Sequence, residues 1–250
     1  MWAFKKSRKL LWPILRRNLP LAAFSELNGA IHLTPQSFLE SVFRLTSEQL
    51  CLMYEEYKNV DRKLRERYRT EATYFPKYYA IGTSTSFLLY CITRITKPLC
   101  ILETGVANGH SSYIFLSALL ANHVGRLYST EINKNCGQLV PAEMRTLWNL
   151  IVLKSAKDFS RVVKSLSEVD LFLHDAGDHS YGLQMYEYLN VKHKMSPGGY
   201  LLSDDVDKSF AFVDFAKSIG CTPSYLVDAG PSGRYTKIFG AIQWPKNIDK

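Results

Sequence analysis

The feature that most constrains this chain is a regular alternation of short apolar runs and helix-like stretches between residues 99 and 203. Five runs have the length and composition of buried strands, and segments with helical spacing separate them. The runs cover residues 99–102, 126–130, 149–153, 169–174 and 199–203. Strands joined by helical crossovers form a parallel sheet that helices cover on both faces. The alternation therefore predicts an α/β fold.

Two more strand candidates close the chain, at residues 224–227 and 237–243, and residues 230–233 suit the turn between them. Two late strands joined in this way predict an antiparallel hairpin on the sheet edge. We therefore expect a Rossmann-like, doubly wound sheet of seven mostly parallel strands with an antiparallel edge hairpin.

The chain ahead of this sheet is predicted to form an N-terminal helical extension, over residues 36–70 and again over 84–96. Apolar side chains recur there at three- and four-residue steps and predict one buried helix face. That face consists of Leu50, Met53, Tyr54, Tyr57, Val60, Leu64 and Tyr68. We divide the chain into a basic amphipathic arm (1–35), a helical cap region (36–97) and a cofactor-binding domain (98–250). The tyrosines of the cap suit a helix interface better than a pocket wall.

The positive charge of the chain is unevenly distributed. The net charge is +8, but six Lys and Arg and no acid lie in the first 25 residues. The remaining chain is nearly balanced, which argues against a nucleic-acid-binding core. The arm is expected to lie on the domain or on a partner subunit, or to contact a membrane surface through residues 1–20. A homo-oligomer through the helical region stays open.

The cellular location is predicted from three features that the sequence lacks: a membrane-spanning run, a signal peptide and paired cysteines. No run of 18 apolar residues is present, and the apolar stretch of the arm is too short for a signal peptide. The five cysteines form no CxxC pair, which favours free thiols over zinc or disulfides. We expect a cytoplasmic protein, peripheral at the membrane if the arm binds there.

The first two strands end in residues that suit a nucleoside ligand. Gly105 permits a tight turn after the first strand, and Gly109 lets a ligand approach the start of the following helix. This GxxxG loop differs from the GxGxxG loop of dinucleotide sites. Glu103 would repel a pyrophosphate but would favour the sulfonium and ammonium groups of S-adenosylmethionine. Glu131, at the end of the second strand, is placed to accept both ribose hydroxyls.

Residues 169–206 carry the strongest motif, VDLFLHDAGDHSYGLQMYEYLNVKHKMSPGGYLLSDDV. The strand end of the DGDHSY type, the PGG turn and the DDV strand end resemble the class I methyltransferase family that includes macrocin-type and cephalosporin-pathway O-methyltransferases. The resemblance covers about residues 98–210. It implies transfer of a methyl group from S-adenosylmethionine to a hydroxyl of a small molecule, such as a sugar, a polyketide or another secondary metabolite.

The same resemblance implies a metal site and a base. Asp175, Asp204 and Asp205 match the metal-binding positions, and three carboxylates with waters suit Mg²⁺. Three acids at one rim would also repel each other unless a cation lay among them. The simpler alternative is that Asp204 or Asp205 caps the following helix. Asp175 is also expected at the cofactor. His179 is the first candidate for the base that deprotonates the acceptor, and Asp178 is the second.

Two stretches depart from the family pattern. The loop after the fourth strand is one residue longer than usual, which leaves the role of Asp178 open. After the third strand, Lys154-Ser155-Ala156 stands where the family often has Gly-Asp-Ser, so Ser155 is expected to take the contact near the adenine.

Three other functions remain open. They are an NAD(P)-dependent Rossmann oxidoreductase, a noncatalytic binding protein that retains the fold, and an RNA methyltransferase. The GxxxG loop with its acid argues against the oxidoreductase, and the full set of acids at the strand ends argues against a noncatalytic protein. The sequence lacks an Asn/Asp-Pro-Pro-Tyr motif, which argues against an RNA methyltransferase.

Overall fold

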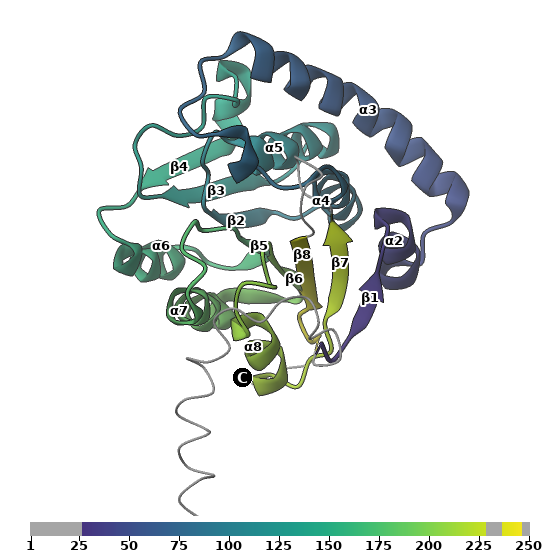
Figure 1. Cartoon of the computed structure of the whole chain (residues 1–250), viewed down its shortest axis with the longest axis vertical. Coiled ribbons are helices and arrows are strands. Elements are labelled where there is room, and N and C mark those ends of the chain that lie inside the picture. The colour runs from purple at the N-terminus through teal and green to yellow at the C-terminus, as the bar shows by residue number, and fades with distance from the viewer. Residues whose placement is uncertain (1–26, 229–236, 247–250) are drawn as a thin grey trace, which may run out of the picture.

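The computed structural model describes residues 27–228 and 237–246 (Figure 1). The strands are β1 (Ala30–His32), β2 (Cys100–Thr104), β3 (Arg126–Glu131), β4 (Trp148–Val152), β5 (Val169–His174), β6 (Met195–Ser203), β7 (Ser224–Asp228) and β8 (Lys237–Gln243). The helices are α2 (Pro35–Phe43), α3 (Ser47–Thr70), α4 (Thr83–Thr96), α5 (His110–Asn122), α6 (Phe159–Ser165), α7 (Tyr181–Val191) and α8 (Ala211–Ser218). Short 3-10 turns are η3 (Lys77–Tyr79), η4 (Ala142–Leu147), η5 (Ala156–Asp158) and η6 (Lys192–Lys194). The proposed membrane contact at residues 1–20 and the turn at 230–233 lie outside the described residues.

One twisted sheet organises these elements, in the order β1-β7-β8-β6-β5-β2-β3-β4. The seven expected strands are all present, and β8 runs antiparallel to both β6 and β7. The short strand β1 adds an eighth, parallel to β7. The antiparallel pair of β7 and β8 is therefore confirmed toward one edge of the sheet, and the short strand β1 lies outside it.

Helices pack on both faces of the sheet, as Figure 1 shows. Neighbouring residues of one strand enter different cores, because side chains alternate across a sheet. In β2, Ile101 belongs to the core beneath α2–α5, and Leu102 belongs to the core beneath α6–α8. In β5, Leu171 and Phe172 divide in the same way. Such strands are apolar throughout, which is why their sequence shows runs rather than alternation.

The helical region predicted over residues 36–70 is interrupted. α2 ends at Arg44, which adopts a left-handed conformation with φ of 56°. Thr46 then caps α3: its hydroxyl accepts from the Gln49 N–H at 3.2 Å, and the Gln49 side chain accepts from the Thr46 N–H at 2.9 Å. This capping box starts a new helix that the apolar spacing alone did not reveal. Within α3, Leu50, Tyr57 and Leu64 are buried as expected, whereas Tyr54 is exposed.

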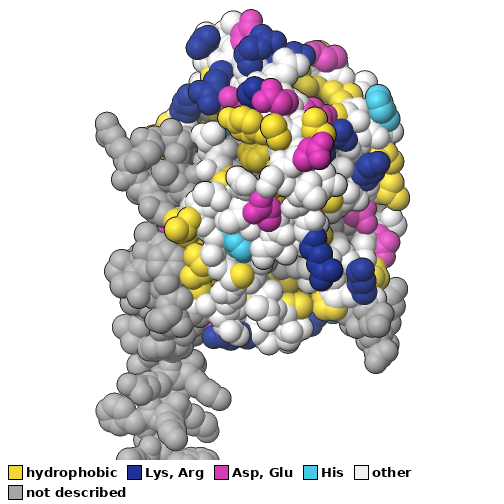
Figure 2. Space-filling view, turned by 90° about the vertical axis from the view of Figure 1, so that its right-hand side faces the viewer, with side chains coloured by type: hydrophobic (Ala, Val, Ile, Leu, Met, Phe, Trp, Pro, Cys, Tyr) yellow, Lys and Arg dark blue, Asp and Glu magenta, His cyan; other side chains and the backbone are white. Residues whose placement is uncertain are grey.

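The outer face of α3 is charged and internally paired. Lys and Arg are interspersed with Asp and Glu across the upper part of Figure 2. Arg65 lies 2.7 Å from Asp61, and Arg94 of α4 lies 3.1 Å from Glu56. No helix within the described ranges is long and apolar enough to cross a bilayer. The cysteines are all free thiols; Cys91 alone is fully buried, because Cys51 is exposed and the others are intermediate.

Candidate active site

The loops after β2, β3 and β5 start side by side at one edge of the sheet. Thr104 pairs with His174 across β2 and β5, and the Asp175 N–H donates to the Thr104 carbonyl at 3.0 Å. The Gly105 N–H likewise donates to the Thr130 carbonyl at 3.0 Å. From β2 the chain continues to β3 on one side, and from the neighbouring β5 it continues to β6 on the other side. Such a switch point opens a crevice at the carboxyl ends of the strands.

A cavity of about 570 Å³ occupies this crevice. Six of the site residues expected from the sequence line it: Gly105, Glu131, Asp175, Asp178, His179 and Asp205. The cap region supplies another wall, from Tyr68, Phe75, Tyr78, Tyr79, Ala80 and Ile81. Three of the cap tyrosines therefore face the cavity, whereas the sequence favoured a helix interface for them.

Glu131 fixes the glycine loop. One carboxylate oxygen accepts from the backbone N–H groups of Val106 and Ala107, at 3.0 and 3.1 Å. The other accepts from the N–H groups of Ile132 and Asn133, at 2.8 and 3.0 Å. The sequence suggested that Glu131 contacts a ribose, but it did not reveal that the carboxylate accepts hydrogen bonds from four backbone N–H groups. The four backbone donors match the four lone-pair sites of the carboxylate, and the side chain also lines the cavity.

Glu103 lies behind the cavity wall, fully buried. Its Oε2 accepts from the hydroxyls of Ser112 and Ser129, at 2.6 and 2.7 Å. Burial raises the pKa of its carboxyl group above the ordinary value, and the serine hydroxyls oppose this. Glu103 shares the α5-facing side of β2 with Ile101, which turns it away from the mouth. The structure thus places it beneath the glycine loop and not among the cavity-lining residues.

The two loop glycines are required by close protein contacts. A Cβ on Gly105 would lie 1.9 Å from the Asp175 carbonyl oxygen, and its φ is +80°. A Cβ on Gly109 would lie 3.1 Å from the Cα of Gly137, with φ of +88°. Gly109 is the N-cap of α5 but does not itself line the cavity. Both positions therefore need glycine whatever ligand is bound.

Three carboxyl groups meet just after the ends of β5 and β6, and two of them, Asp175 and Asp205, line the cavity. Oxygens of Asp175, Asp204 and Asp205 all lie within 4.8 Å of one another. Asp204 is 1% and Asp205 5% exposed. Burial, followed by the neighbouring Asp204, raises the pKa of Asp175 well above its ordinary value. Burial and then Asp205 raise the pKa of Asp204 to about 7. The cluster therefore favours the approach of positive charge.

Lys237, the first residue of β8, supplies one such charge. Its Nζ lies 3.4 Å from Asp204 Oδ2 and 3.3 Å from Asp205 Oδ2, and the residue is 5% exposed. Burial lowers its pKa, but the nearby carboxylates outweigh this and raise it overall. No motif marked Lys237 in the sequence, because a strand about 30 residues further along the chain brings it to the cluster.

His179 and Asp178 both line the cavity but differ in their partners. His179 Nε2 lies 3.4 Å from Asp205 Oδ2, and its Nδ1 is buried with no hydrogen-bond partner among the described residues. Burial lowers the pKa of His179, and the neighbouring Asp205 opposes this shift. Asp178 is exposed, and its Oδ1 accepts from the Ser180 N–H at 2.9 Å, just before α7.

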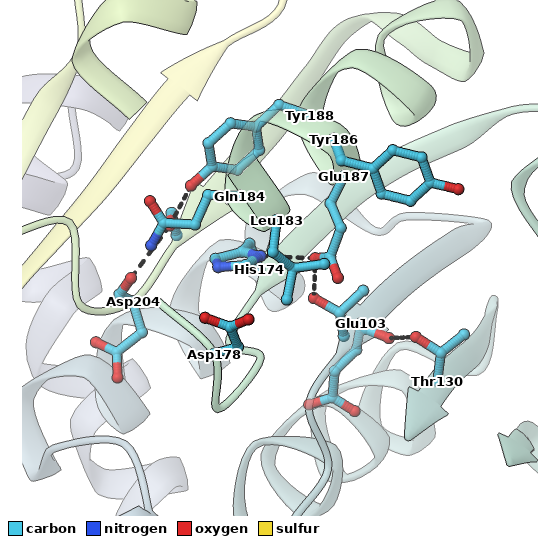
Figure 3. A network of polar contacts seen from close by, with 12 residues as sticks. Glu103, Thr130, His174, Asp178, Leu183, Gln184, Tyr186, Glu187, Tyr188 and Asp204 are labelled. Atoms are coloured by element: carbon cyan, nitrogen blue, oxygen red, sulfur yellow. Dashed lines mark hydrogen bonds and ion pairs between the residues drawn. The ribbon is translucent and has the colours of Figure 1, made fainter. Parts of the chain in front are cut away.

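A buried polar network connects β2, β5 and α7 beside the cavity (Figure 3). Glu187 Oε2 accepts from the Thr104 hydroxyl at 2.7 Å and lies 2.6 Å from His174 Nδ1. Glu187 and Thr104 line the cavity, whereas His174 is completely buried. Neither His174 nor Glu187 is among the candidate residues that the sequence motifs suggested. The only available signal for Glu187 was its place in the family-like stretch after the strand.

Two residues of the glycine-loop region hold the cap in place. The Asn108 side chain accepts from the Phe75 N–H at 2.9 Å and donates to the Phe75 carbonyl at 2.7 Å. His110 lies 3.0 Å from the Tyr68 hydroxyl and 2.8 Å from the Ser86 hydroxyl. Neither Asn108 nor His110 stood out in the sequence, because their partners come from the cap.

Ser155 is exposed and does not line the cavity. Its backbone N–H and hydroxyl donate to Asp158, at 3.1 and 3.3 Å, so it begins the turn η5. The apolar neighbours Leu153 and Ala156 line the cavity instead.

Residues 102–206 match the family model described as a methyltransferase domain. No curated protein matches the chain in sequence. The fold is similar to the O-methyltransferase of Bacillus cereus solved with SAH, with a TM-score of 0.55 and 14% identity over 83% of this chain and 96% of that one. It is also similar to the O-methyltransferase TomG of Streptomyces achromogenes solved with SAM, with a TM-score of 0.56 and 18% identity over 83% and 95%.

A third similar structure is the SAH-bound methyltransferase PaMTH1 of Podospora anserina, with a TM-score of 0.51 and 15% identity over 74% of this chain and 87% of that one. The matched region runs from β2 to the turn after β6 and so contains every strand end that forms the cavity. Residues 102–206 therefore match a methyltransferase domain, within a chain whose fold is that of the similar O-methyltransferase structures.

Proposed function

We propose that this protein transfers the methyl group of S-adenosylmethionine to a hydroxyl of a small molecule, with help from a divalent cation. One observation carries the proposal: a single cavity is lined by the glycine loop after β2, by Glu131 of β3, and by Asp175, His179 and Asp205 after β5 and β6. A donor and an acceptor held in that space would lie next to each other. Placing two reactants together is the main contribution that an enzyme makes to such a transfer.

The cofactor side is assigned to the first two strand ends. Glu131, which lines the cavity, is proposed to accept from the ribose hydroxyls by sharing its oxygens with the backbone donors that already contact them. Ile132 and Leu153 line the same part of the cavity and suit the flat, apolar faces of adenine. Ser155 and Glu103 do not line the cavity, so we assign them supporting roles at η5 and beneath the glycine loop. Two structures of similar fold were solved with SAH and with SAM, which supports S-adenosylmethionine as the ligand of this cavity.

The carboxylate cluster fits a hard cation such as Mg²⁺. Oδ1 of Asp204 and Oδ1 of Asp205 are buried with no hydrogen-bond partner among the described residues. Lys237 brings only one positive charge against three carboxyl groups, and the pKa values of Asp175 and Asp204 are raised even in its presence. Asp175, Asp204 and Asp205 would hold the ion. When bound, such an ion lowers the pKa of a nearby hydroxyl.

His179 is proposed as the base. Its ring lines the cavity next to Asp205, whose carboxylate stabilises the ring once it carries a second proton. The acceptor hydroxyl gives its proton to His179 while its oxygen forms a bond to the methyl carbon. The carbon–sulfur bond breaks, and S-adenosylhomocysteine leaves without the positive charge of the donor. Asp178 is the second candidate, although its Oδ1 already accepts from the helix start.

Transfer of radiolabelled methyl groups tests the proposal. Purified protein is incubated with methyl-labelled S-adenosylmethionine and a panel of sugars, phenols and polyketides, with Mg²⁺ or with a chelator. Labelled product that depends on a free hydroxyl and falls strongly in His179→Ala supports the assignment. Labelling of amines or thiols alone would contradict the hydroxyl assignment, and binding of NAD(P) without S-adenosylmethionine would favour the oxidoreductase alternative.

Three further expectations stay predictions. They are membrane contact through residues 1–20, a homo-oligomer through the N-terminal helices, and a cytoplasmic location. Sedimentation of the full chain, with and without anionic vesicles, measures the first two.

A further inference from the structure

Backbone contacts at the start of β8 fix the main chain of Lys237 next to the carboxylate cluster. The Val206 N–H donates to the Ile238 carbonyl at 3.0 Å, and the Ile238 N–H donates to Asp207 Oδ1 at 3.2 Å. These bonds tie the turn after β6 to the residue that follows Lys237. The position of the lysine backbone is therefore set by the same turn that carries Asp204 and Asp205.

The ammonium group of Lys237 uses the oxygens that a metal ion would use. Its Nζ contacts Oδ2 of Asp204 and Oδ2 of Asp205, at 3.4 and 3.3 Å. Both carboxylates belong to the cluster of three that has ligand spacing. A Mg²⁺ or Mn²⁺ ion binds carboxylate oxygen at about 2.1 Å. A metal ion bound to these two Oδ2 atoms would lie next to the ammonium group of Lys237. Both are positively charged and buried, so they would repel each other strongly.

The cavity offers the ammonium group of Lys237 an alternative position. Its side chain lines the cavity, and the unbranched four-carbon stem can swing the ammonium group away from the carboxylates without moving β8. The Oδ1 atoms of both aspartates, which lack partners among the described residues, remain available to the incoming ion.

We propose that Lys237 is the resident counter-ion of the Asp175–Asp204–Asp205 cluster, and that a divalent cation binds there by displacing its ammonium group. The inference rests on the metal site of the proposed function. Competition of this kind weakens the affinity for the ion and makes it exchangeable. It also means that the cluster is never left without positive charge.

Titration with Mn²⁺ tests the competition without any methyl transfer. The free-ion signal is followed by electron paramagnetic resonance in the full chain, without cofactor, for the wild type, Lys237→Met and Lys237→Arg. We expect Lys237→Met to bind Mn²⁺ at least roughly tenfold more tightly than the wild type, because no ammonium group then competes for the oxygens. Lys237→Arg keeps the charge and should stay close to the wild type.

Lys208→Met is the matched control. Lys208 also lines the cavity, and its Nζ lies 3.3 Å from Asp207. Its removal subtracts the same charge nearby and should change the affinity by less than roughly threefold, as a screened charge does. Adding Asp204→Asn to Lys237→Met should abolish the gain. Circular dichroism checks that each variant is folded.

An affinity in folded Lys237→Met that equals or falls below the wild-type value would overturn the proposal. So would the absence of Mn²⁺ binding from all variants at millimolar ion. Failure of the proposed function has a different signature, because it would appear as an absence of S-adenosylmethionine binding while the metal competition persisted.

Discussion

Replacing Glu131 by Gln tests whether its charge holds the glycine loop. The carboxylate accepts four backbone N–H groups, two from the loop after β2 and two from the turn after β3. An amide has only one oxygen, so its NH₂ group must face one of the two donor pairs. At least two charge-assisted hydrogen bonds are then lost, and each contributes about 1.5–3 kcal/mol.

Glu131 is only partly buried, and water can replace some of what is lost. We therefore expect the free energy of unfolding to fall by about 2–4 kcal/mol. For a chain of this size, that corresponds to a Tm lower by roughly 4–16 °C. The assay is urea and thermal unfolding monitored by circular dichroism. Glu143→Gln, at an exposed position in η4, is the control and should lie within about 0.5 kcal/mol of the wild type.

A Glu131→Gln variant as stable as the control would refute this reasoning. It would mean that the loop keeps its conformation without the carboxylate. Cofactor affinity, measured separately at a temperature where the variant is folded, then reports whether Glu131 also contacts the ribose.

Three other variants probe the site. Gly105→Ala should cost about 3 kcal/mol or more and reduce the folded yield, because its Cβ would meet a backbone oxygen at 1.9 Å, whereas Gly182→Ala, with open space around it, should be neutral or stabilising by differential scanning fluorimetry. Burial and a neighbouring lysine lower the pKa of His110 to about 4, so the unfolded chain takes up a proton first and stability is lost as pH falls from about 6.5 toward 4. Urea unfolding at pH 7 and pH 5 should show a loss of about 1–2 kcal/mol that His110→Gln abolishes, and an equal loss in that variant would contradict the assignment. Asn108→Ala removes both bonds to Phe75 and should speed hydrogen exchange in residues 72–79 without changing exchange in β5.

The sequence predicts the sheet well because its strands are buried on both faces. Residues 169–174 and 237–243 were predicted with the bounds that β5 and β8 have in the structure. The strand β1 escaped notice because three residues carry no pattern. The break between α2 and α3 escaped as well, since the apolar spacing continues while the capping box at Thr46 restarts the helix.

The site was predictable in its location but not in all its contacts. The carboxyl ends of parallel strands meet at one edge, so Asp175 and Asp205 were expected to lie together, and they do. Glu103 was predicted to contact the cofactor, but its side chain points toward α5. Side chains alternate along a strand, so a shift of one residue decides which face of the sheet a side chain lies on. Lys237 required knowledge of which strand pairs with β6, which only the tertiary structure provides.

The central claim is that the cavity at the β2–β5 switch binds S-adenosylmethionine. Isothermal titration of the purified chain with S-adenosylmethionine, S-adenosylhomocysteine and NAD(P)H, repeated with folded Glu131→Ala, tests it most directly. The account predicts saturable binding of both sulfur nucleosides, lost or strongly weakened in Glu131→Ala, and no binding of the dinucleotide. Binding of the dinucleotide alone, or of none of the three by a folded chain, would contradict it.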